Sequence, residues 1–463
     1  MIGLRSALSE LAWPSVMTDH SAMLMALLRQ YDVSQWWTAE QLQEAQFLQL
    51  SQLAEHAFRT VPFHAERLRD AGFVSGMKMT PQIWSRLPIL TRDNVRDAEK
   101  KLRATSYPET FGETSWANSG GSTGIPVRVL KSGMDGVMWQ AAHLRELEWN
   151  GIDFSLEIAN LRGAASYLKA LSQNPGAFED LGGLILADWG HPAALLRETG
   201  RMGLLEPTLP LATQAEYLMK RRPGYLIMRP SGLRLILGHF REMGLTLDSL
   251  RSVWTMSESV DESLRELCRE VFGCPVISSY SSNETGYIAI QCPDATNYHA
   301  VSESVLVEII DQHGNPCKPG EIGRVLVTPL HNYAMPLLRY QVGDEAEVGP
   351  PCPCGRGLPS LTRIVGRIED YLTLRSGEKK RVHAEHYRIS AIRAVREFQL
   401  VQTSFETIEL RLVVSRALDA DEREELDDVL RSAFEAYLKW SVVFVDSLPR
   451  TSAGKLMQFI SEV

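Results

Sequence analysis

Segments with the spacing of helices alternate with short strand-like segments along the middle of the chain, from about residue 113 to residue 329. The strand-like segments are rich in apolar and β-branched residues. This alternation constrains the fold more than any other feature, because it predicts an α/β domain whose sheets are covered by helices. The expected strands are Glu157–Leu161, Tyr225–Met228, Val253–Met256, Val276–Ser279 and Val305–Ile310.

The two ends of the chain differ from this middle part. Apolar residues recur at three- and four-residue spacing over residues 21–71, which predicts a helical lead-in within about residues 1–110. Near the other end, two strand-like segments at 397–402 and 407–414 precede an amphipathic helix over about 419–438. We therefore expect a large α/β domain over residues 1–365 and a small α+β domain over residues 366–463.

Composition excludes several classes of function. The formal charge is −9, with 48 basic and 57 acidic residues and no long basic run, so a nucleic-acid or anionic-membrane partner is not expected. The early apolar stretch, Ala22–Leu28, is too short to span a bilayer, and the N-terminus lacks the pattern of a signal peptide. We expect a cytoplasmic protein, in which six cysteines do not form a disulfide scaffold.

A run of small residues, Ser119-Gly120-Gly121-Ser122-Thr123-Gly124, is the first sign of chemistry. Glycines let backbone N–H groups approach a phosphate, and the hydroxyls of Ser and Thr add further donors. The run lacks the Gly-Lys-Ser/Thr ending of a Walker loop, so a flexible turn is the alternative interpretation. Further motifs decide between the two.

Those motifs follow in a fixed order and carry a resemblance to a known family. They are Tyr280–Gly286, Tyr340–Asp344, Gly366–Asp370 and the near-terminal Leu448–Lys455. Together with the glycine-rich run they resemble the acyl-adenylate-forming superfamily. Because Pro351-Cys352-Pro353-Cys354-Gly355-Arg356 lies just upstream of Gly366-Arg367, the chain is most similar to the phenylacetate-CoA ligase family within it.

The resemblance implies an ATP-dependent ligase. A carboxylic acid, expected to be an aryl or arylacetic acid, reacts with ATP to give acyl-AMP and pyrophosphate, and the acyl group then passes to a thiol, that of coenzyme A. The alternative is transfer to an amine, another nitrogen nucleophile or a carrier-protein thiol, which a poor match to the family loop at residues 377–381 favours. A nucleotide-binding regulatory protein without catalysis is a third interpretation. The sequence leaves open whether the chain forms a homodimer.

The resemblance also implies roles for individual residues. Tyr280 is expected to stack on adenine, while Asp344 and Arg367 are expected to hydrogen-bond the ribose hydroxyls. Pocket residues for the acid are expected just before the second motif. The residues implied to bind ATP or AMP are Ser119, Gly121, Ser122, Thr123, Gly124, Ser279, Tyr280, Asn283, Asp344 and Arg367, and those implied for the acid are Trp254, Met256, Ser257 and Ser278.

Three residues have special roles by the same resemblance. Glu284 is the expected Mg²⁺ ligand, and Glu369 is the hinge about which the small, mobile domain rotates. Lys455 brings a positive charge to the carboxylate and the α-phosphate, and acts in catalysis together with Glu284 and Arg367. The chain departs from the family at Val127, where a lysine is common, and also has Asn283 in place of threonine and Phe459 near a position that is often basic. Lys131 and Arg128 are near enough in sequence to replace the missing charge.

Four residues outside these motifs have the chemistry of a metal site. Cys292, His299, Cys352 and Cys354 offer three thiolates and one imidazole, which suit tetrahedral Zn²⁺ in a closed, structural site. Some members of the resembled family carry Cys and His at matching places. The alternative is buried thiols that pack against unrelated loop residues.

Overall fold

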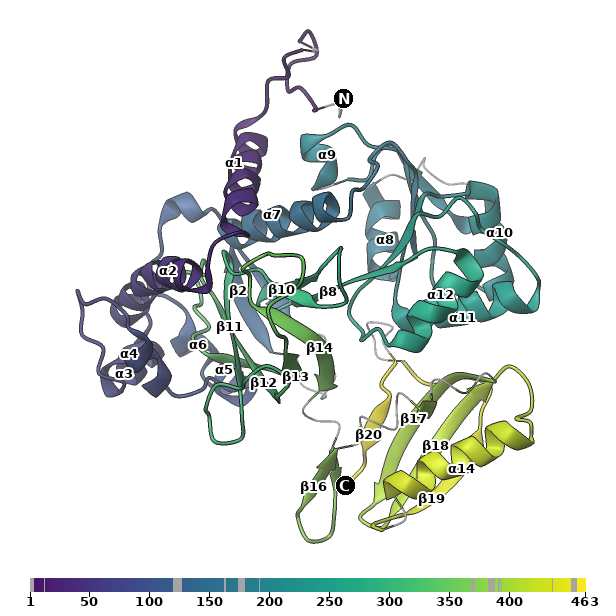
Figure 1. The fold of residues 1–463 in the computed structure, drawn as a ribbon. Coiled ribbons are helices and arrows are strands. Elements are labelled where there is room, and N and C mark those ends of the chain that lie inside the picture. Colours follow the sequence, from purple (N-terminus) through teal and green to yellow (C-terminus); the bar gives the residue numbers. More distant parts are fainter. Residues whose placement is uncertain are drawn as a thin grey trace. The chain divides into compact units, whose positions relative to one another are not determined.

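A computed structural model describes residues 4–11, 13–119, 127–161, 164–173, 180–190, 192–367, 371–381, 388–389, 392, 394–434, 436–450 and 456–463. The expected fold class is confirmed: the chain is a mixed α/β protein with sheets flanked by helices and a small C-terminal domain (Figure 1). The chain divides into two compact units. The first consists of Met1–Ser155, Gly190–Thr199 and Ser278–Val365, and the second consists of Leu156–Trp189, Gly200–Ile277 and Gly366–Val463.

The first unit is built on a largely antiparallel sheet in the order β11-β12-β13-β14-β10-β9-β8. Apolar residues of its strands, such as Ile288, Val325 and Tyr340, form a fully buried core. A separate hairpin of β1 and β2 pairs Asn118 with Arg128, two residues that flank the glycine-rich run in sequence. The strands are β1 (Thr114–Asn118), β2 (Arg128–Ser132), β8 (Val276–Ser282), β9 (Gly286–Gln291), β10 (Tyr298–Ala300), β11 (Val305–Ile310), β12 (Ile322–Pro329), β13 (Tyr340–Val348) and β14 (Ser360–Arg367).

The first unit contains the helical lead-in that the sequence predicts. Thr38 begins α2 with a capping box that satisfies the first backbone N–H groups. Leu50 and Leu53 of this helix then pack with Leu330 and Leu338, which flank the sheet strands. Long α7 lies against α1 (Figure 1). The helices are α1 (Asp19–Ser34), α2 (Ala39–Thr60), α3 (Pro62–Asp70), α4 (Pro81–Arg86), α5 (Arg92–Asp97), α6 (Glu99–Leu102), the 3₁₀ turn η1 (Glu109–Phe111), α7 (Gly133–Trp149) and α9 (Ala193–Leu196).

The second unit contains a short sheet in the order β7-β6-β3-β5-β4, parallel except for β4. Its central strands are fully buried because helices cover them, as parallel sheets require. Neighbouring α10, α11 and α12 pack side by side (Figure 1). The elements are β3 (Ile158–Leu161), α8 (Ala164–Gln173), η2 (Asp180–Gly182), β4 (Leu184–Leu186), β5 (Met202–Leu204), α10 (Leu211–Arg221), β6 (Tyr225–Met228), α11 (Pro230–Glu242), β7 (Ser252–Thr255) and α12 (Glu262–Phe272).

The C-terminal part of this unit has its own sheet in the order β19-β18-β17-β20, covered by α14 (Figure 1). Leu400, Leu412 and Leu430 are fully buried between the two layers. Whether residues 366–463 act as a separate domain stays a prediction. The elements are β15 (Tyr371–Thr373), β16 (Lys379–Arg381), β17 (Val395–Ser404), β18 (Thr407–Val414), α14 (Ala420–Phe434), β19 (Lys439–Phe444) and β20 (Phe459–Ser461).

The five strands expected in the middle of the chain all form, with bounds that differ by at most a few residues in β3, β7 and β8. Both expected C-terminal strands form as β17 and β18, and the amphipathic helix forms as α14. Across the described residues, no helix has both the length and the apolar composition that crossing a bilayer requires.

Tight packing around Gly203 gives a test of the second unit. A Cβ atom at Gly203 would lie 2.5 Å from Oη of Tyr217, whose side chain is fully buried. We expect Gly203→Ala to lower the free energy of unfolding by about 1–3 kcal/mol through overpacking. Gly238 in α11 has open space at its Cβ position, so Gly238→Ala should raise that free energy by about 0.5–1 kcal/mol through helix propensity. Guanidinium unfolding measures both, and equal effects would contradict the packing.

Candidate active site

The glycine-rich run is closed at its base by Ser119. The backbone N–H of Ser119 donates to the carbonyl of Val127 at 2.8 Å, and the N–H of Val127 donates to Ser119 Oγ at 2.7 Å. Residues 119 and 127 therefore lie side by side at the loop end of the β1–β2 hairpin. Of the predicted phosphate-binding residues, Gly121, Ser122, Thr123 and Gly124 lie outside the described residues.

The second motif forms the tight turn between β8 and β9. Ser282 Oγ accepts the N–H of Thr285 at 3.0 Å, and Gly286 has a φ of 80°, a left-handed conformation that favours glycine. The turn holds Glu284 in a buried position, with 5% of its surface exposed. Asn283 Nδ2 donates to the carbonyl of Asn118 at 2.7 Å, so this turn contacts the base of the glycine-rich run.

Arg92 joins the same two motifs, and sequence reasoning missed it. Its Nη1 lies 3.2 Å from Oε1 of Glu284, and its Nη2 donates to Ser119 Oγ at 3.0 Å. Arg92 is the first residue of α5, and no motif marks it in the sequence. Only the folded chain places it beside Glu284.

Asp344 of the third motif lies in the same unit. Tyr280 of β8 donates through its Oη to Asp344 Oδ2 at 2.8 Å. Tyr280 is mostly buried, whereas Asp344 is partly exposed and has Gly343, with a φ of 90°, before it on β13. Tyr340 Oη reaches Glu284 Oε1 at 3.5 Å, so β13 borders both carboxylates. Three predicted nucleotide-binding motifs thus gather in the first unit.

Lys131 adds positive charge near this group of residues. Burial lowers its pKa, and the carboxylates of Asp135 and Glu284 offset part of that effect. Burial raises the pKa of Asp135, against hydrogen bonds that its Oδ2 accepts from the N–H and Oγ of Ser132. Arg128, the other residue considered as a replacement for a lysine at 127, instead lies over the ring of Trp116 at 4.3 Å.

The carboxylate of Glu284 has the chemistry of a ligand for a hard cation. A carboxylate is the protein ligand that Mg²⁺ prefers beside phosphate and water oxygens. Glu284 Oε1 here faces positive charge and a phenol, so the site is already arranged to compensate a buried anion. Magnesium binding at Glu284 stays a prediction.

The four predicted zinc ligands gather at one place in the first unit. Their donor atoms all lie within 4.8 Å of one another. Antiparallel β9 and β10 bring Cys292 and His299 together, and the loop before β14 supplies Cys352 and Cys354. Cys354 Sγ lies 3.3 Å from Nε2 of His299, and the two sulfur atoms of Cys292 and Cys352 are 3.8 Å apart.

The surroundings of this Cys–His cluster also suit a structural metal. His299 Nδ1 lies 3.4 Å from the carbonyl of Leu358, the kind of contact that orients a metal-binding imidazole. Trp149 packs edge-on against the His299 ring at 5.7 Å, and Arg356 lies over Trp149 at 4.5 Å. Three sulfurs and one imidazole nitrogen match a closed tetrahedral site.

Comparison with known proteins shows what the chain is similar to. The family described as AMP-binding enzyme matches residues 187–331, and the CapK C-terminal domain matches residues 374–462. A phenylacetate-coenzyme A ligase of Thermus thermophilus is 23% identical over 454 residues, covering 91% of this chain and 96% of that protein. These matches support the phenylacetate-CoA ligase family of the AMP-binding superfamily. The chain is therefore an adenylate-forming ligase.

Two further proteins are similar to this chain, one over part of its sequence and one over most of its fold. Protein CapK of Staphylococcus aureus is 28% identical over 213 residues, covering 44% of this chain and 45% of that protein. The fold resembles the crystal structure of 2-hydroxyisobutyryl-CoA ligase in the postadenylation state in complex with R3-HIB-AMP, with a TM-score of 0.71, 18% identity, and coverage of 93% of this chain and 91% of that chain.

Some residues predicted for the ligase site do not join Ser119, Glu284 and Asp344 in the part of the chain that the structure describes. Arg367 ends β14, but its side chain, Glu369 and Lys455 lie outside what the structure describes. Trp254 belongs to the second unit, where its ring stacks on Tyr225 at 5.3 Å.

The remaining residues predicted to contact the acid or the nucleotide lie in or just after strands β7 and β8. Met256 and Ser257 follow β7, and Ser257 has a φ of 71°. Ser278 and Ser279 lie in β8, where the N–H of Ser278 donates to Gln291 Oε1 at 3.0 Å. Their roles stay predictions.

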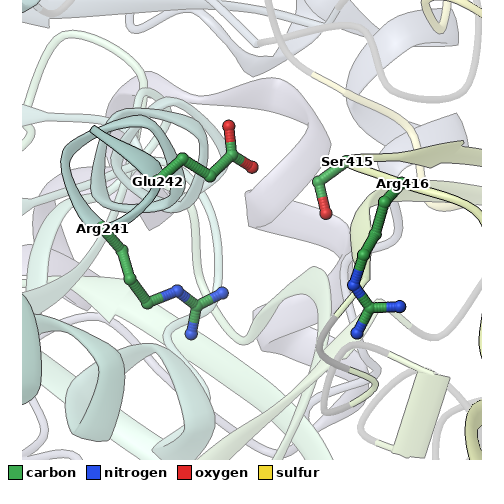
Figure 2. Close-up of a pocket in the computed structure, with 4 residues that line it drawn as sticks. All are labelled: Arg241, Glu242, Ser415 and Arg416. Carbon is green, nitrogen blue, oxygen red and sulfur yellow. The ribbon is translucent and has the colours of Figure 1, made fainter. Parts of the chain in front are cut away.

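A hollow of about 370 Å³ in the second unit is lined by Arg241 and Glu242 of α11 and by Ser415 and Arg416 (Figure 2). Both oxygens of Glu242 accept from Arg396 at 2.7 Å, and Arg416 pairs with Glu422 at 2.7 Å. Because partners within the protein already meet the charges of Glu242 and Arg416, we assign the hollow no ligand.

The Cys–His cluster predicts that the purified protein contains about one zinc ion per chain. Cys354→Ser removes one soft ligand, so we expect it to lose most of the zinc and to unfold at a lower temperature. Cys317 lies outside the cluster, and Cys317→Ser is the matched control that should keep the metal. Elemental analysis measures the result. A metal-free wild-type protein, or equal zinc in both variants, would contradict the site.

Proposed function

We propose that the chain activates an aryl or arylacetic acid with ATP and transfers the acyl group to the thiol of coenzyme A. The observation that carries this proposal is the contact of three separate motifs in the first unit. Arg92 connects Ser119 to Glu284, and Tyr280 connects β8 to Asp344. A site that holds a triphosphate, a ribose and an acid needs polar groups from several segments close together.

The reaction has two steps. An oxygen of the substrate carboxylate bonds to the α-phosphorus of ATP, and the bond from that phosphorus to the pyrophosphate breaks with its electron pair. The thiolate of coenzyme A then bonds to the acyl carbon, and AMP leaves with the electron pair of the acyl–oxygen bond. Both steps crowd negative charge together, so positive groups are required in the first one.

Roles follow for the residues of this site. Asp344 accepts from the ribose hydroxyls, and Tyr280, which donates to it, holds the carboxylate in place. Glu284 would hold Mg²⁺, which neutralises charge on the phosphate oxygens when bound. Lys455 supplies a compact positive charge to the substrate carboxylate as it approaches the α-phosphate.

An aromatic cluster next to the Glu284 turn supports an aryl acid as the substrate. Trp139 of α7 stacks on His143 at 5.4 Å, and 38% of Trp139 is exposed. His143 Nδ1 lies 2.9 Å from Oη of Tyr287, which also donates to Glu146 at 2.8 Å. Aromatic surface of this kind, in a fixed orientation, favours contact with another ring.

The acceptor loop favours one second candidate. Residues 377–381 are a poor fit to the loop that the family resemblance implies. Transfer to an amine, another nitrogen nucleophile or a carrier-protein thiol is therefore the alternative second step. Adenylation is common to both candidates.

A panel of acids separates these candidates. In ATP–pyrophosphate exchange, we expect phenylacetate and benzoate to exceed acetate and 2-hydroxyisobutyrate by about 10-fold or more in kcat/KM, because an apolar pocket gains from burying a ring. Adding coenzyme A should then yield a thioester. A preference for the small acids would contradict the aryl substrate, and exchange without thioester would reject coenzyme A and keep the alternative.

Lys455 is expected to act in one half-reaction only. Lys455→Ala should lower the rate of acyl-AMP formation by about 10²–10³-fold, since it removes charge stabilisation from the transition state. Transfer from preformed acyl-AMP should stay within about twofold of wild type. Rapid-quench measurement of the two half-reactions checks this, and an equal loss in both would rule out a role confined to adenylation.

A further inference from the structure

Arg92 has the position of a phosphate-binding residue. Its guanidinium contacts Glu284, the expected cation ligand, and Ser119, which closes the glycine-rich run. The side chains of Arg92 and Glu284 are only 14% and 6% exposed, so this ion pair is largely removed from water. An ion pair kept from water at the meeting point of two ligand-binding motifs suggests more than a structural role.

The main chain, and not only the long side chain, fixes the place of Arg92. Leu90, two residues earlier, donates its N–H to the carbonyl of Arg339 and accepts the N–H of Gln341, both at 2.9 Å. These bonds add the segment to β13, the strand that carries Asp344. Thr91 then caps α5. The main chain just before Arg92 is therefore bonded to the strand that carries the proposed ribose-binding residue.

The charge that the family places in the glycine-rich run is missing from this chain, which has Val127 there. Val127 is buried and uses its N–H to bond Ser119. Arg128 packs on Trp116 and lies 3.7 Å from Glu99. Among these candidates, Arg92 is the residue that contacts both motifs directly.

We propose that Arg92 binds the β- and γ-phosphates of ATP and, in the nucleotide-free protein, neutralises Glu284. A guanidinium has five N–H donors in a planar fork, so it can bond two phosphate oxygens while it still contacts Ser119. As the bond between the α-phosphorus and the pyrophosphate breaks, the electron pair stays on the pyrophosphate. Arg92 stabilises that added charge.

This inference rests on the proposed function, and nucleotide binding without any acid tests it. We expect Arg92→Gln to weaken the binding of ATP and of inorganic pyrophosphate by about 10- to 100-fold, the effect of one or two charge-assisted hydrogen bonds. Binding of AMP should change less than about threefold, because AMP lacks the phosphates that Arg92 contacts. Calorimetry with and without Mg²⁺ measures all three ligands.

Controls separate this role from a purely structural one. Arg96 lies on the same helix and pairs with exposed Asp93 and Asp97, so Arg96→Gln should leave all three affinities unchanged. Arg92→Lys keeps the charge and should lose less ATP affinity than Arg92→Gln. If Arg92→Gln does not fold, the double variant Arg92→Gln/Glu284→Gln, which leaves no buried unpaired carboxylate, provides the ATP-to-AMP comparison against Glu284→Gln alone.

The outcomes are distinct. Loss of ATP and pyrophosphate binding with AMP binding retained supports the inference. Equal loss of ATP and AMP binding, or no loss of either, overturns it while the proposed function stands, since wild-type binding is measured in the same experiment. A wild-type protein that binds neither nucleotide overturns the proposed function itself.

Discussion

A carboxylate held away from water must be neutralised, and the site depends on how this chain neutralises Glu284. The tight turn after β8 places that side chain inside the first unit, where an unpaired charge would be costly. Arg92 supplies the opposite charge, and Tyr340 adds a phenol. The segment before α5, the base of the glycine-rich run and β13 therefore meet at one buried anion, although they are far apart in the sequence.

Fixed placement changes what a positive group contributes to binding. A lysine on a glycine-rich loop must be ordered when a ligand arrives, at a cost in conformational entropy. Arg92 stands instead at the start of a capped helix whose approach is bonded to a strand. A preorganised donor stabilises developing charge without that cost. Loss of the usual lysine at position 127 is thus compatible with phosphate chemistry.

Much of the fold could be predicted from local pattern. Tyr225–Met228 has the same bounds in the sequence analysis and in β6, because a wholly buried parallel strand appears as an uninterrupted apolar run. β8 extends to Ser282, beyond the predicted end at Ser279, because its polar end pairs with β9 as far as Gly286. Apolar pattern alone does not reveal such a polar extension.

The site was predictable in its motifs and not in its contacts. The order of motifs indicated Glu284 and Asp344. In the first unit Arg92 joins Glu284 to Ser119, and Tyr280 of β8 bonds to Asp344. Arg92 could not be found in this way, since its role depends on Leu90 pairing with Tyr340, a tertiary contact between distant segments. The bond from Tyr280 to Asp344 is equally invisible in the sequence, because it joins strands β8 and β13, which are far apart along the chain.

Short β10 has a consequence beyond the Cys–His cluster. This strand of three residues carries His299 and bonds to β9 on one side and to β14 on the other. β9 begins at Gly286, at the end of the Glu284 turn, and β14 ends at Arg367. Any displacement of His299 would thus disturb two strands at once, one that starts at the Glu284 turn and one that leads to Arg367.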